Sequence, residues 1–288
     1  LWSTFRGTEL FLINKMLTGA LRVGVSRKLV AKAVGKMTGI SEAELAHRLM
    51  GGLKPTQEFV ETLMSPEQQG ERPPSQPYPF YLAYPLEAKD RVKLGPREAW
   101  QVEWKWDGIR GQLIHRQQEI YLWSRGEELV TDQFPELHKA GLTGLPEGVF
   151  DGELLVQREG QPGLFAELQR RLGRKAPGPK IQKEFPVGFF IYDLLEYQGH
   201  DLRHLPLRER RQQLEQVPLS DPFYLAPVLT ESSFDELDRL RQQARLHRAE
   251  GLMLKALEGV YKTGRKRGEW WKWKTDPMTL DTVLLYAQ

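Results

Sequence analysis

The stretch that decides the fold is Glu103-Trp104-Lys105-Trp106-Asp107-Gly108-Ile109-Arg110, in which a lysine stands two residues before an Asp-Gly pair. Charged and aromatic residues alternate here, as in a strand with one buried face, and Asp-Gly is a common turn pair. A lysine so placed lies at the mouth of a sheet. Its amine acts as a nucleophile when neighbouring cations or a metal lower its pKa. We therefore expect a reactive lysine where one strand ends.

The composition is that of an ordinary globular protein. The 288 residues are 40% hydrophobic and 27% charged. No apolar run approaches the roughly 18 residues that span a membrane, so we expect no membrane partner. The chain has no Cys, which excludes disulfides, thiolate metal sites and cysteine nucleophiles and favours a cytoplasmic protein.

Charge is distributed unevenly along the chain. Residues 1–54 carry nine Lys or Arg and three Glu, whereas the remaining residues carry 32 basic and 35 acidic side chains. A basic block is typical of a nucleic-acid-binding surface, although a solvated helical surface gives the same pattern. Within this block, Arg27 and Lys28 follow Ser26 at a potential helix start. The N-terminus of a helix beside two cations is a potential phosphate-binding site. The alternative is an ordinary capped helix without a ligand.

A proline-rich segment separates two regions of different pattern. Residues 1–64 show helical spacing of apolar residues, and residues 65–85 contain six prolines, which indicates an extended linker. From residue 86 we expect strands at 99–106, 109–116, 119–124, 149–156, 187–197, 223–228, 252–256 and 270–274, and helices at 164–172, 206–216 and 233–247. This order predicts an α+β fold of antiparallel sheets flanked by helices.

Further charged clusters stand in or beside the expected strands: Ser124-Arg125, Asp151-Gly152-Glu153, Tyr192-Asp193-Leu194, Glu250-Gly251 with Lys255, and Lys272 with Lys274. Each has a structural explanation, because Asp-Gly pairs form turns and Trp-Lys alternation follows from one buried face. Together they supply a nucleophilic lysine, two carboxylates for a metal, an aromatic ring for a base and cations for phosphates. This combination is what nucleotidyl transfer requires.

The order of these motifs resembles the motif series of ATP-dependent DNA ligases, within the covalent nucleotidyltransferase superfamily. The resemblance covers residues 86–275, and LFAELQRRLGRK at 164–175 resembles a segment typical of DNA ligases. Residues 1–64 resemble the end of the helical DNA-binding domain that precedes the catalytic domain in larger ligases of the bacterial and archaeal type. The resemblance implies an adenylation, or nucleotidyltransferase, domain of ATP-grasp-like architecture.

The resemblance also implies a role for each motif residue. Lys105 would carry AMP, Glu103 would read the adenine amino group, and Tyr192 would stack on adenine. Glu153 would hold the ribose or a metal-bound water, and Glu250 would bind the metal. The cations that would contact ribose, phosphates or the nick are Arg110, Arg125, Lys272 and Lys274.

The implied reaction has three steps. Lys105 takes AMP from ATP and releases pyrophosphate, AMP passes to the 5′-phosphate of a nick, and the 3′-hydroxyl displaces AMP. The expected cofactors are ATP and Mg²⁺, which accepts few protein ligands beside phosphate oxygens. The expected partner is nicked double-stranded DNA, contacted by Arg27, Lys28, Arg110 and Arg125. We expect a monomer in the bacterial cytosol or nucleoid.

Ligases of this family continue past the last lysine pair into an OB-fold domain, and residues 276–288 resemble the connector to it. We therefore expect the chain to be a piece of a larger ligase, with slow or absent self-adenylylation and retained nucleotide binding at Lys105.

Three alternatives share part of this pattern. An RNA ligase or a capping-type guanylyltransferase has similar motifs, but residues 1–64 and 164–175 resemble DNA ligases. An NAD-dependent ligase usually has a four-cysteine zinc module, and this chain has no Cys. A non-catalytic nucleic-acid-binding module would keep an inactive nucleotide pocket, whereas this sequence retains the motif residues Lys105, Glu153 and Glu250.

Overall fold

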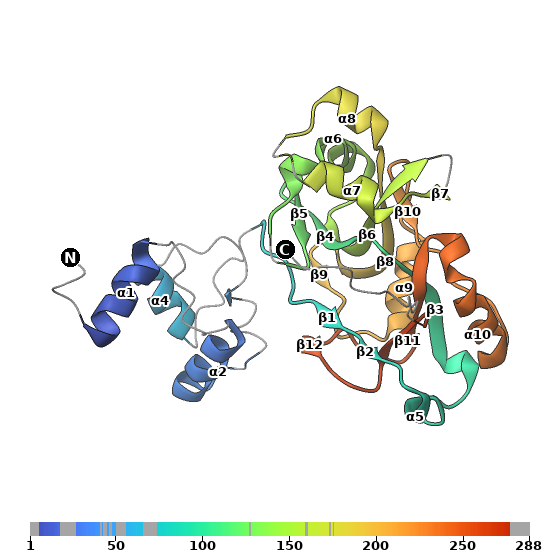
Figure 1. Ribbon diagram of the computed structural model, residues 1–288, viewed down its shortest axis with the longest axis horizontal. Coiled ribbons are helices and arrows are strands. Elements are labelled where there is room, and N and C mark those ends of the chain that lie inside the picture. Colours follow the sequence, from blue (N-terminus) through green and yellow to red (C-terminus); the bar gives the residue numbers. More distant parts are fainter. Residues whose placement is uncertain are drawn as a thin grey trace, which may run out of the picture. The chain divides into compact units, whose positions relative to one another are not determined.

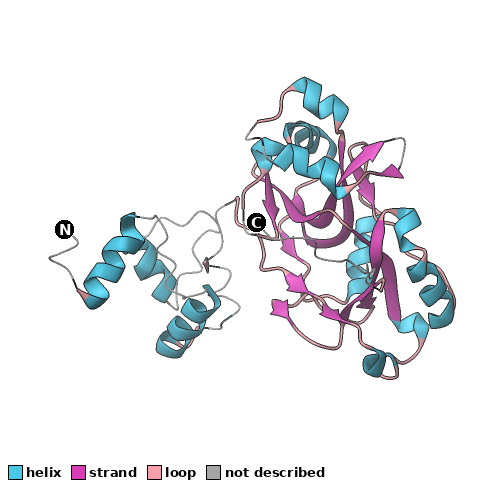
Figure 2. Cartoon of the chain, viewed as in Figure 1, coloured by secondary structure: helices cyan, strands magenta, loops and turns pink. Residues whose placement is uncertain are grey.

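The computed structural model divides the chain into two compact units, Leu1–Glu71 and Arg72–Gln288. It describes residues 6–17, 27–40, 42, 45, 48–49, 56–65, 74–126, 128–158, 161–172, 174 and 176–276. In these parts the first unit is helical and the second mixes helices with strands (Figures 1 and 2). The expected change of pattern along the chain is therefore confirmed.

The first unit contains α1 (Gly7–Leu17), α2 (Arg27–Thr38) and α4 (Gln57–Met64). The helix α4 begins where Thr56 accepts a hydrogen bond from the backbone N–H of Phe59, as a helix N-cap does. The small apolar core of the unit consists of Ala31, Leu45, Leu49 and Leu63. The connector expected at 276–288 lies, from residue 277 on, outside the described residues.

The larger sheet of the second unit has seven strands. Its main path runs β10-β8-β6-β4-β5, and all neighbours on this path are antiparallel except β10 and β8. The strands are β4 (Ile109–Arg116), β5 (Glu119–Ser124), β6 (Gly148–Arg158), β7 (Gln161–Pro162), β8 (Val187–Tyr197), β9 (His200–Asp201) and β10 (Phe223–Leu225).

The smaller sheet has the order β2-β13-β11-β3. Its strands are β2 (Tyr84–Pro85), β3 (Trp100–Trp106), β11 (Ala249–Ala256) and β13 (Trp270–Lys274). A separate parallel pair joins β1 (Tyr81–Leu82) to β12 (Gly264–Arg265). The helices of this unit are α5 (Ala88–Arg91), α6 (Pro135–Gly144), α7 (Phe165–Leu172), α8 (Pro179–Glu184), α9 (Leu207–Glu215) and α10 (Phe234–Gln242), with short 3-10 turns at Arg97–Ala99, Thr131–Gln133 and Ala244–His247.

Successive side chains of a strand point to opposite faces of its sheet, so each sheet has two faces with different contacts. One face of the larger sheet packs on Leu137 of α6, Leu168 of α7 and Leu214 of α9. The outer face of the smaller sheet presents Trp271 and Trp273 to Leu237 of α10. The other faces of the two sheets line one cavity together and carry the charged motif residues.

Part of the expected linker belongs to the second unit. Tyr78 and Tyr81 are fully buried, and β1 and β2 pair with strands from the end of the chain. The interpretation of 65–85 as one extended linker was therefore wrong for residues 74–85. Prolines favour extended backbone, but the aromatic residues between them bury enough apolar surface to hold this backbone against the sheets.

No helix in the described part of the chain has both the length and the apolar character to cross a bilayer. The helix expected at 233–247 is shorter, because α10 ends at Gln242 and continues as a 3-10 turn. Its start is confirmed: Ser233 and Glu236 form a reciprocal capping box.

Candidate functional site

A cavity of about 610 Å³ opens between the inner faces of the two sheets. Its lining includes seven Lys or Arg side chains and four Asp or Glu side chains, and this excess of positive charge suits a polyanion. The cations are Lys105, Arg110, Arg125, Lys255, Arg265, Lys272 and Lys274, and the acids are Glu103, Asp107, Glu153 and Glu250.

Lys105 lies near the end of β3, where the chain turns through Asp107 and Gly108 into β4. The turn needs glycine at 108 because a Cβ atom there would stand 2.4 Å from the carbonyl oxygen of Leu154. The Nζ atom of Lys105 is 3.3 Å from Oε2 of Glu250. The reactive lysine expected from the sequence is therefore paired with an acid from a strand more than a hundred residues away.

Glu250 reaches the cavity because β11 contains a bulge. The register of β11 against β3 shifts between Ala249 and Leu252, so Glu250 lines the same cavity as Met253. At the bulge Gly251 has φ +146°, and a Cβ atom there would lie 2.2 Å from the carbonyl oxygen of Trp273. Only glycine fits this position.

Glu250 joins two lysines. Its Oε2 atom is 2.6 Å from Nζ of Lys274 and 3.3 Å from Nζ of Lys105. Burial raises the pKa of Glu250, but the hydrogen bond from Lys274 and the charge of Lys105 outweigh burial and hold it below its usual value. Burial and the charge of Glu250 raise the pKa of neighbouring Asp107.

Lys272 and Lys274 alternate with Trp271 and Trp273 along β13, so the lysines face the cavity and the tryptophans face α10. Burial and the nearby charge of Arg265 lower the pKa of Lys272. These crowded cations create a strongly positive region without a matching number of acids.

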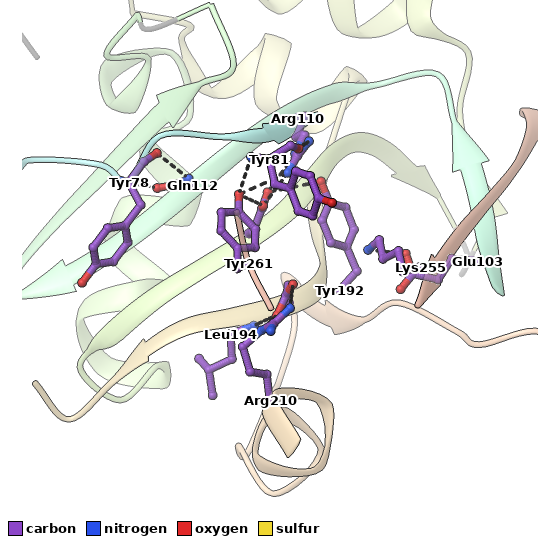
Figure 3. Close-up of polar contacts among 12 residues, drawn as sticks. Tyr78, Tyr81, Glu103, Arg110, Gln112, Tyr192, Leu194, Arg210, Lys255 and Tyr261 are labelled. Carbon is purple, nitrogen blue, oxygen red and sulfur yellow. Dashed lines mark hydrogen bonds and ion pairs between the residues drawn. The ribbon is translucent and has the colours of Figure 1, made fainter. Parts of the chain in front are cut away.

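A buried charged pair stands deeper in the cavity. Nζ of Lys255 is 2.7 Å from Oε2 of Glu103, and both side chains are almost fully buried. Gln101 donates a 2.5 Å hydrogen bond to the other oxygen of Glu103. Lys255 also lies 3.8 Å from the ring centre of Tyr192, a cation–π contact that joins the smaller sheet to the larger one (Figure 3).

Arg110 is bound tightly to the wall of the larger sheet (Figure 3). Its Nε and Nη2 atoms donate to the two oxygens of Asp151, at 3.1 and 2.7 Å. Nη1 donates to the carbonyl oxygen of Tyr81 at 2.7 Å, and Nη2 also donates to the hydroxyl of Tyr261 at 3.2 Å. These contacts employ four of the five guanidinium N–H groups, which leaves one for a ligand.

Glu153 lines the cavity from β6, two residues after the fully buried Asp151. Desolvation raises the pKa of Glu153 to about 7, although the charges of Lys105 and Arg110 oppose this rise. Arg125 lies just after β5, where its backbone N–H donates 2.8 Å to the carbonyl oxygen of Arg110. Its exposed side chain places a cation at the cavity mouth.

The structure brings together nine of the residues proposed from the sequence: Glu103, Lys105, Arg110, Arg125, Glu153, Tyr192, Glu250, Lys272 and Lys274. Arg27 and Lys28 begin α2, but their side chains lie outside the described residues. Three important residues received no role from the sequence: Asp151, Lys255 and Tyr261. Asp151 and Lys255 belong to the sequence motifs described above. Asp151 is two residues from Glu153, and Lys255 is two residues from Met253, so strand alternation could have placed each pair on one face of its strand. No sequence pattern pointed to Tyr261.

Within the described residues, no three His, Asp or Glu side chains come close enough to hold a metal ion by themselves. The cavity does contain the carboxylates of Asp107, Glu153 and Glu250. Mg²⁺ is usually held by one or two carboxylates together with water and the phosphate oxygens of a substrate. These carboxylates are therefore the residues that could hold Mg²⁺ beside a bound phosphate.

Comparison with known proteins assigns the second unit to a protein family. The family described as "ATP dependent DNA ligase domain" matches residues 82–274. A probable DNA ligase of Koribacter versatilis is 32% identical over 94% of this chain and 51% of its own length. A DNA ligase of Methanothrix thermoacetophila is 29% identical over 96% of this chain and 50% of its own length.

The chain thus spans about half the length of these relatives. Among solved structures, a mycobacterial DNA ligase D complexed with ATP and MES has the same fold over 68% of this chain and 60% of its own, with a TM-score of 0.53 and 24% identity. The family match covers well over half of the residues, including every cavity-lining cation. The chain belongs to the family of ATP-dependent DNA ligases.

Proposed function

We propose that this chain is the nucleotide-transferring part of an enzyme that seals nicks in double-stranded DNA through a lysyl-AMP intermediate. The observation that carries the proposal is the setting of Lys105: its amine faces a cavity with three more cations than acids, beside Glu250 at 3.3 Å. Membership of the ligase family supports the same conclusion.

In the first step, Nζ of Lys105 attacks the α-phosphorus of ATP as a neutral amine. A P–N bond forms, the bond from the α-phosphorus to the bridging oxygen breaks, and pyrophosphate leaves with that electron pair. The proton of the amine passes to solvent. AMP then moves to the 5′-phosphate of the nick, which frees Lys105, and the 3′-hydroxyl of the nick finally displaces AMP.

The deeper part of the cavity would hold adenine. Tyr192 presents an aromatic ring, and Met253 lines the cavity from the smaller sheet, so a flat base fits between aromatic and thioether surfaces. Glu103 supplies the acceptor for the adenine amino group. Its second oxygen is bound by Gln101, which keeps the carboxylate in a fixed orientation.

The outer part would hold the ribose and the phosphates. Glu153 accepts a ribose hydroxyl or a metal-bound water, and Lys272 and Lys274 neutralise the α-phosphate. Arg110 offers its remaining Nη1–H group to the nucleotide or the nick, and the exposed Arg125 meets the nick phosphate. Positioning and charge neutralisation supply most of the catalysis in phosphoryl transfer.

Mg²⁺ would be held by Glu250 and Glu153 together with phosphate oxygens and water. When bound, it neutralises charge on the reacting phosphate and on the leaving pyrophosphate. We further propose that Arg27 and Lys28 contact the DNA backbone, that the enzyme is a monomer, and that it acts in the bacterial cytosol or nucleoid.

The test is the intact mass of the chain after incubation with ATP and Mg²⁺. Addition of one AMP in the wild type, its absence in Lys105→Ala and its retention in Lys139→Ala would support the proposal. Lys139 is a matched control because it is an exposed lysine outside the cavity. GTP in place of ATP tests the capping-type alternative.

If no adduct forms, a nick that already carries AMP on its 5′-phosphate provides the second measurement. Sealing of this nick without ATP needs no new lysyl adduct. It would therefore show that the site is catalytically active and that only the transfer of AMP from ATP to Lys105 is slow. Absence of both adduct and sealing, in this chain and in a form extended by an OB-fold domain, would contradict the proposal and favour a non-catalytic DNA-binding module.

A further inference from the structure

Tyr261 is a buried residue outside the motifs that pointed to the function, yet its hydroxyl lies at the centre of the polar contacts drawn in Figure 3. The hydroxyl donates to Oδ2 of Asp151 at 2.6 Å. It accepts from Nη2 of Arg110 at 3.2 Å and from the backbone N–H of Tyr81 at 3.3 Å. One donor and two acceptor sites are the full capacity of a phenol.

The carboxylate of Asp151 is equally saturated. Its Oδ1 accepts from Nε of Arg110 at 3.1 Å and from the hydroxyl of Tyr192 at 3.2 Å. Its Oδ2 accepts from Nη2 of Arg110 at 2.7 Å and from the hydroxyl of Tyr261. Asp151 is fully buried, so water cannot replace a lost partner without a rearrangement.

Tyr261 is itself held rigidly. Its ring meets those of Tyr81 and Trp270 edge-on, at interplanar angles of 75° and 88°. Its backbone N–H donates to the carbonyl oxygen of Arg203 at 2.9 Å. These contacts fix the ring, and the hydroxyl donates from there to Oδ2 of Asp151.

We propose that Tyr261 is a positioning residue for nucleotide binding. Its hydroxyl orients Asp151, and Asp151 in turn sets the guanidinium of Arg110 and the ring of Tyr192 on the cavity wall. The inference rests on the proposed function, because it takes Arg110 and Tyr192 as nucleotide contacts. Tyr261 touches no nucleotide in this scheme and acts through Asp151 and through the hydrogen bond that it accepts from Arg110.

The test compares Tyr261→Phe with Tyr78→Phe. Both replacements remove one hydroxyl from the same aromatic cluster, but the hydroxyl of Tyr78 donates to Glu196 and not to Asp151. The readout is the dissociation constant for AMP, measured by calorimetry. AMP has no leaving group, so adduct formation does not disturb the measurement. We expect Tyr261→Phe to weaken AMP binding about tenfold, in line with the loss of a hydrogen bond to a charged group, and Tyr78→Phe to leave it unchanged.

A double-mutant cycle separates positioning from general stability. Arg110→Lys removes the planar group that Asp151 orients, so Tyr261→Phe should cost little further affinity in an Arg110→Lys background. Full additivity of the two losses, equal losses in the two Phe variants, or wild-type affinity in Tyr261→Phe would each overturn the inference. If Tyr261→Phe does not fold, 3,5-difluorotyrosine at 261 and at 78 provides a second comparison, because ring fluorination makes the hydroxyl a stronger donor and a weaker acceptor. AMP affinity should then change at 261 and not at 78, and equal affinities would overturn the inference.

The wild-type protein distinguishes this inference from the function on which it rests. If the wild type neither binds AMP nor forms an adduct, the proposed function falls and the inference falls with it. If the wild type binds AMP and the two Phe variants bind it equally, only the role of Tyr261 is wrong.

Discussion

Nζ of Lys105 lies 3.3 Å from Oε2 of Glu250, so the end of β3 and the bulge of β11 meet at one ion pair. The two residues lie far apart in sequence and belong to neighbouring antiparallel strands. Lys274 shares the same carboxylate oxygen at 2.6 Å. Glu250 therefore holds the two lysines near each other against their mutual repulsion.

Glu250→Gln should lower the rate of AMP transfer to Lys105 while changing AMP affinity little. The amide keeps the shape of the side chain but removes the charge that organises both lysines and would hold Mg²⁺. We expect a loss of at least about a hundredfold, as is typical when one preorganised charge is removed from an active site. Intact mass against time measures the rate, in a form extended by an OB-fold domain if this chain itself forms no adduct. Glu258→Gln, at an exposed acid paired with Arg208, is the control. Equal rates in the wild type and Glu250→Gln would refute this role.

Glu153 should make stability depend on pH. Its pKa is raised to about 7 in the folded protein, from 4.5 without the fold. The folded state binds the proton more tightly, so this contribution to stability is present below pH 4.5 and is lost as the pH rises through about 7. Glu153→Gln should therefore raise the Tm more at pH 8 than at pH 5. The Tm is measured by thermal unfolding at both pH values. An equal increase in Tm at pH 5 and pH 8 would show that the fold does not raise the pKa of Glu153.

Lys255→Met should destabilise the protein because it leaves the buried carboxylate of Glu103 without its cation. We expect a loss of about 3–5 kcal/mol in the free energy of unfolding, which is usual when one partner of a buried pair is removed. Adding Glu103→Gln should recover much of this loss, since no buried charge then remains. Urea unfolding followed by tryptophan fluorescence measures both variants. A double variant no more stable than Lys255→Met would contradict the explanation.

Gly251→Ala should disturb both folding and catalysis. Its φ of +146° is unfavourable for alanine, and the added Cβ would stand 2.2 Å from the carbonyl oxygen of Trp273. We expect a loss of about 2 kcal/mol or more in the free energy of unfolding and a slower AMP transfer, because the bulge aims Glu250 into the cavity. Gly144→Ala is the control, as its Cβ would meet only Oγ of Ser220 at 3.7 Å. Similar stabilities of the two alanine variants would argue against a strained bulge.

Much of the local structure was predictable from the sequence, because alternation and capping are local signals. The strands expected at 109–116, 119–124, 187–197 and 270–274 coincide with β4, β5, β8 and β13. The capping box at Ser233 was equally visible. The motif residues that line the cavity could be recognised because their order along the chain carries the resemblance to a family.

The partners of these residues were decided only by the tertiary structure. Alternation assigns a side chain to a face of a strand, but the register between distant strands decides which side chains on that face touch. The pairs Lys105–Glu250 and Lys255–Glu103 depend on such long-range register. Tyr261 lies in the segment between β11 and β12, and tertiary packing brings its hydroxyl to Asp151.

In the segment 74–85, too, the sequence predicted the local structure and the tertiary structure decided its contacts. Its prolines determined that the backbone is extended, and nothing local indicated where it lies. Tyr78 is hydrogen-bonded to Gln112 of β4 and Glu196 of β8, and the ring of Tyr81 packs on Trp270 of β13. These contacts placed the segment beside the site, where the carbonyl oxygen of Tyr81 binds Arg110. The sequence by itself thus determined the strands and the chemistry available on their faces. The tertiary structure decided which charges meet, because burial and strand pairing join residues that no local pattern relates.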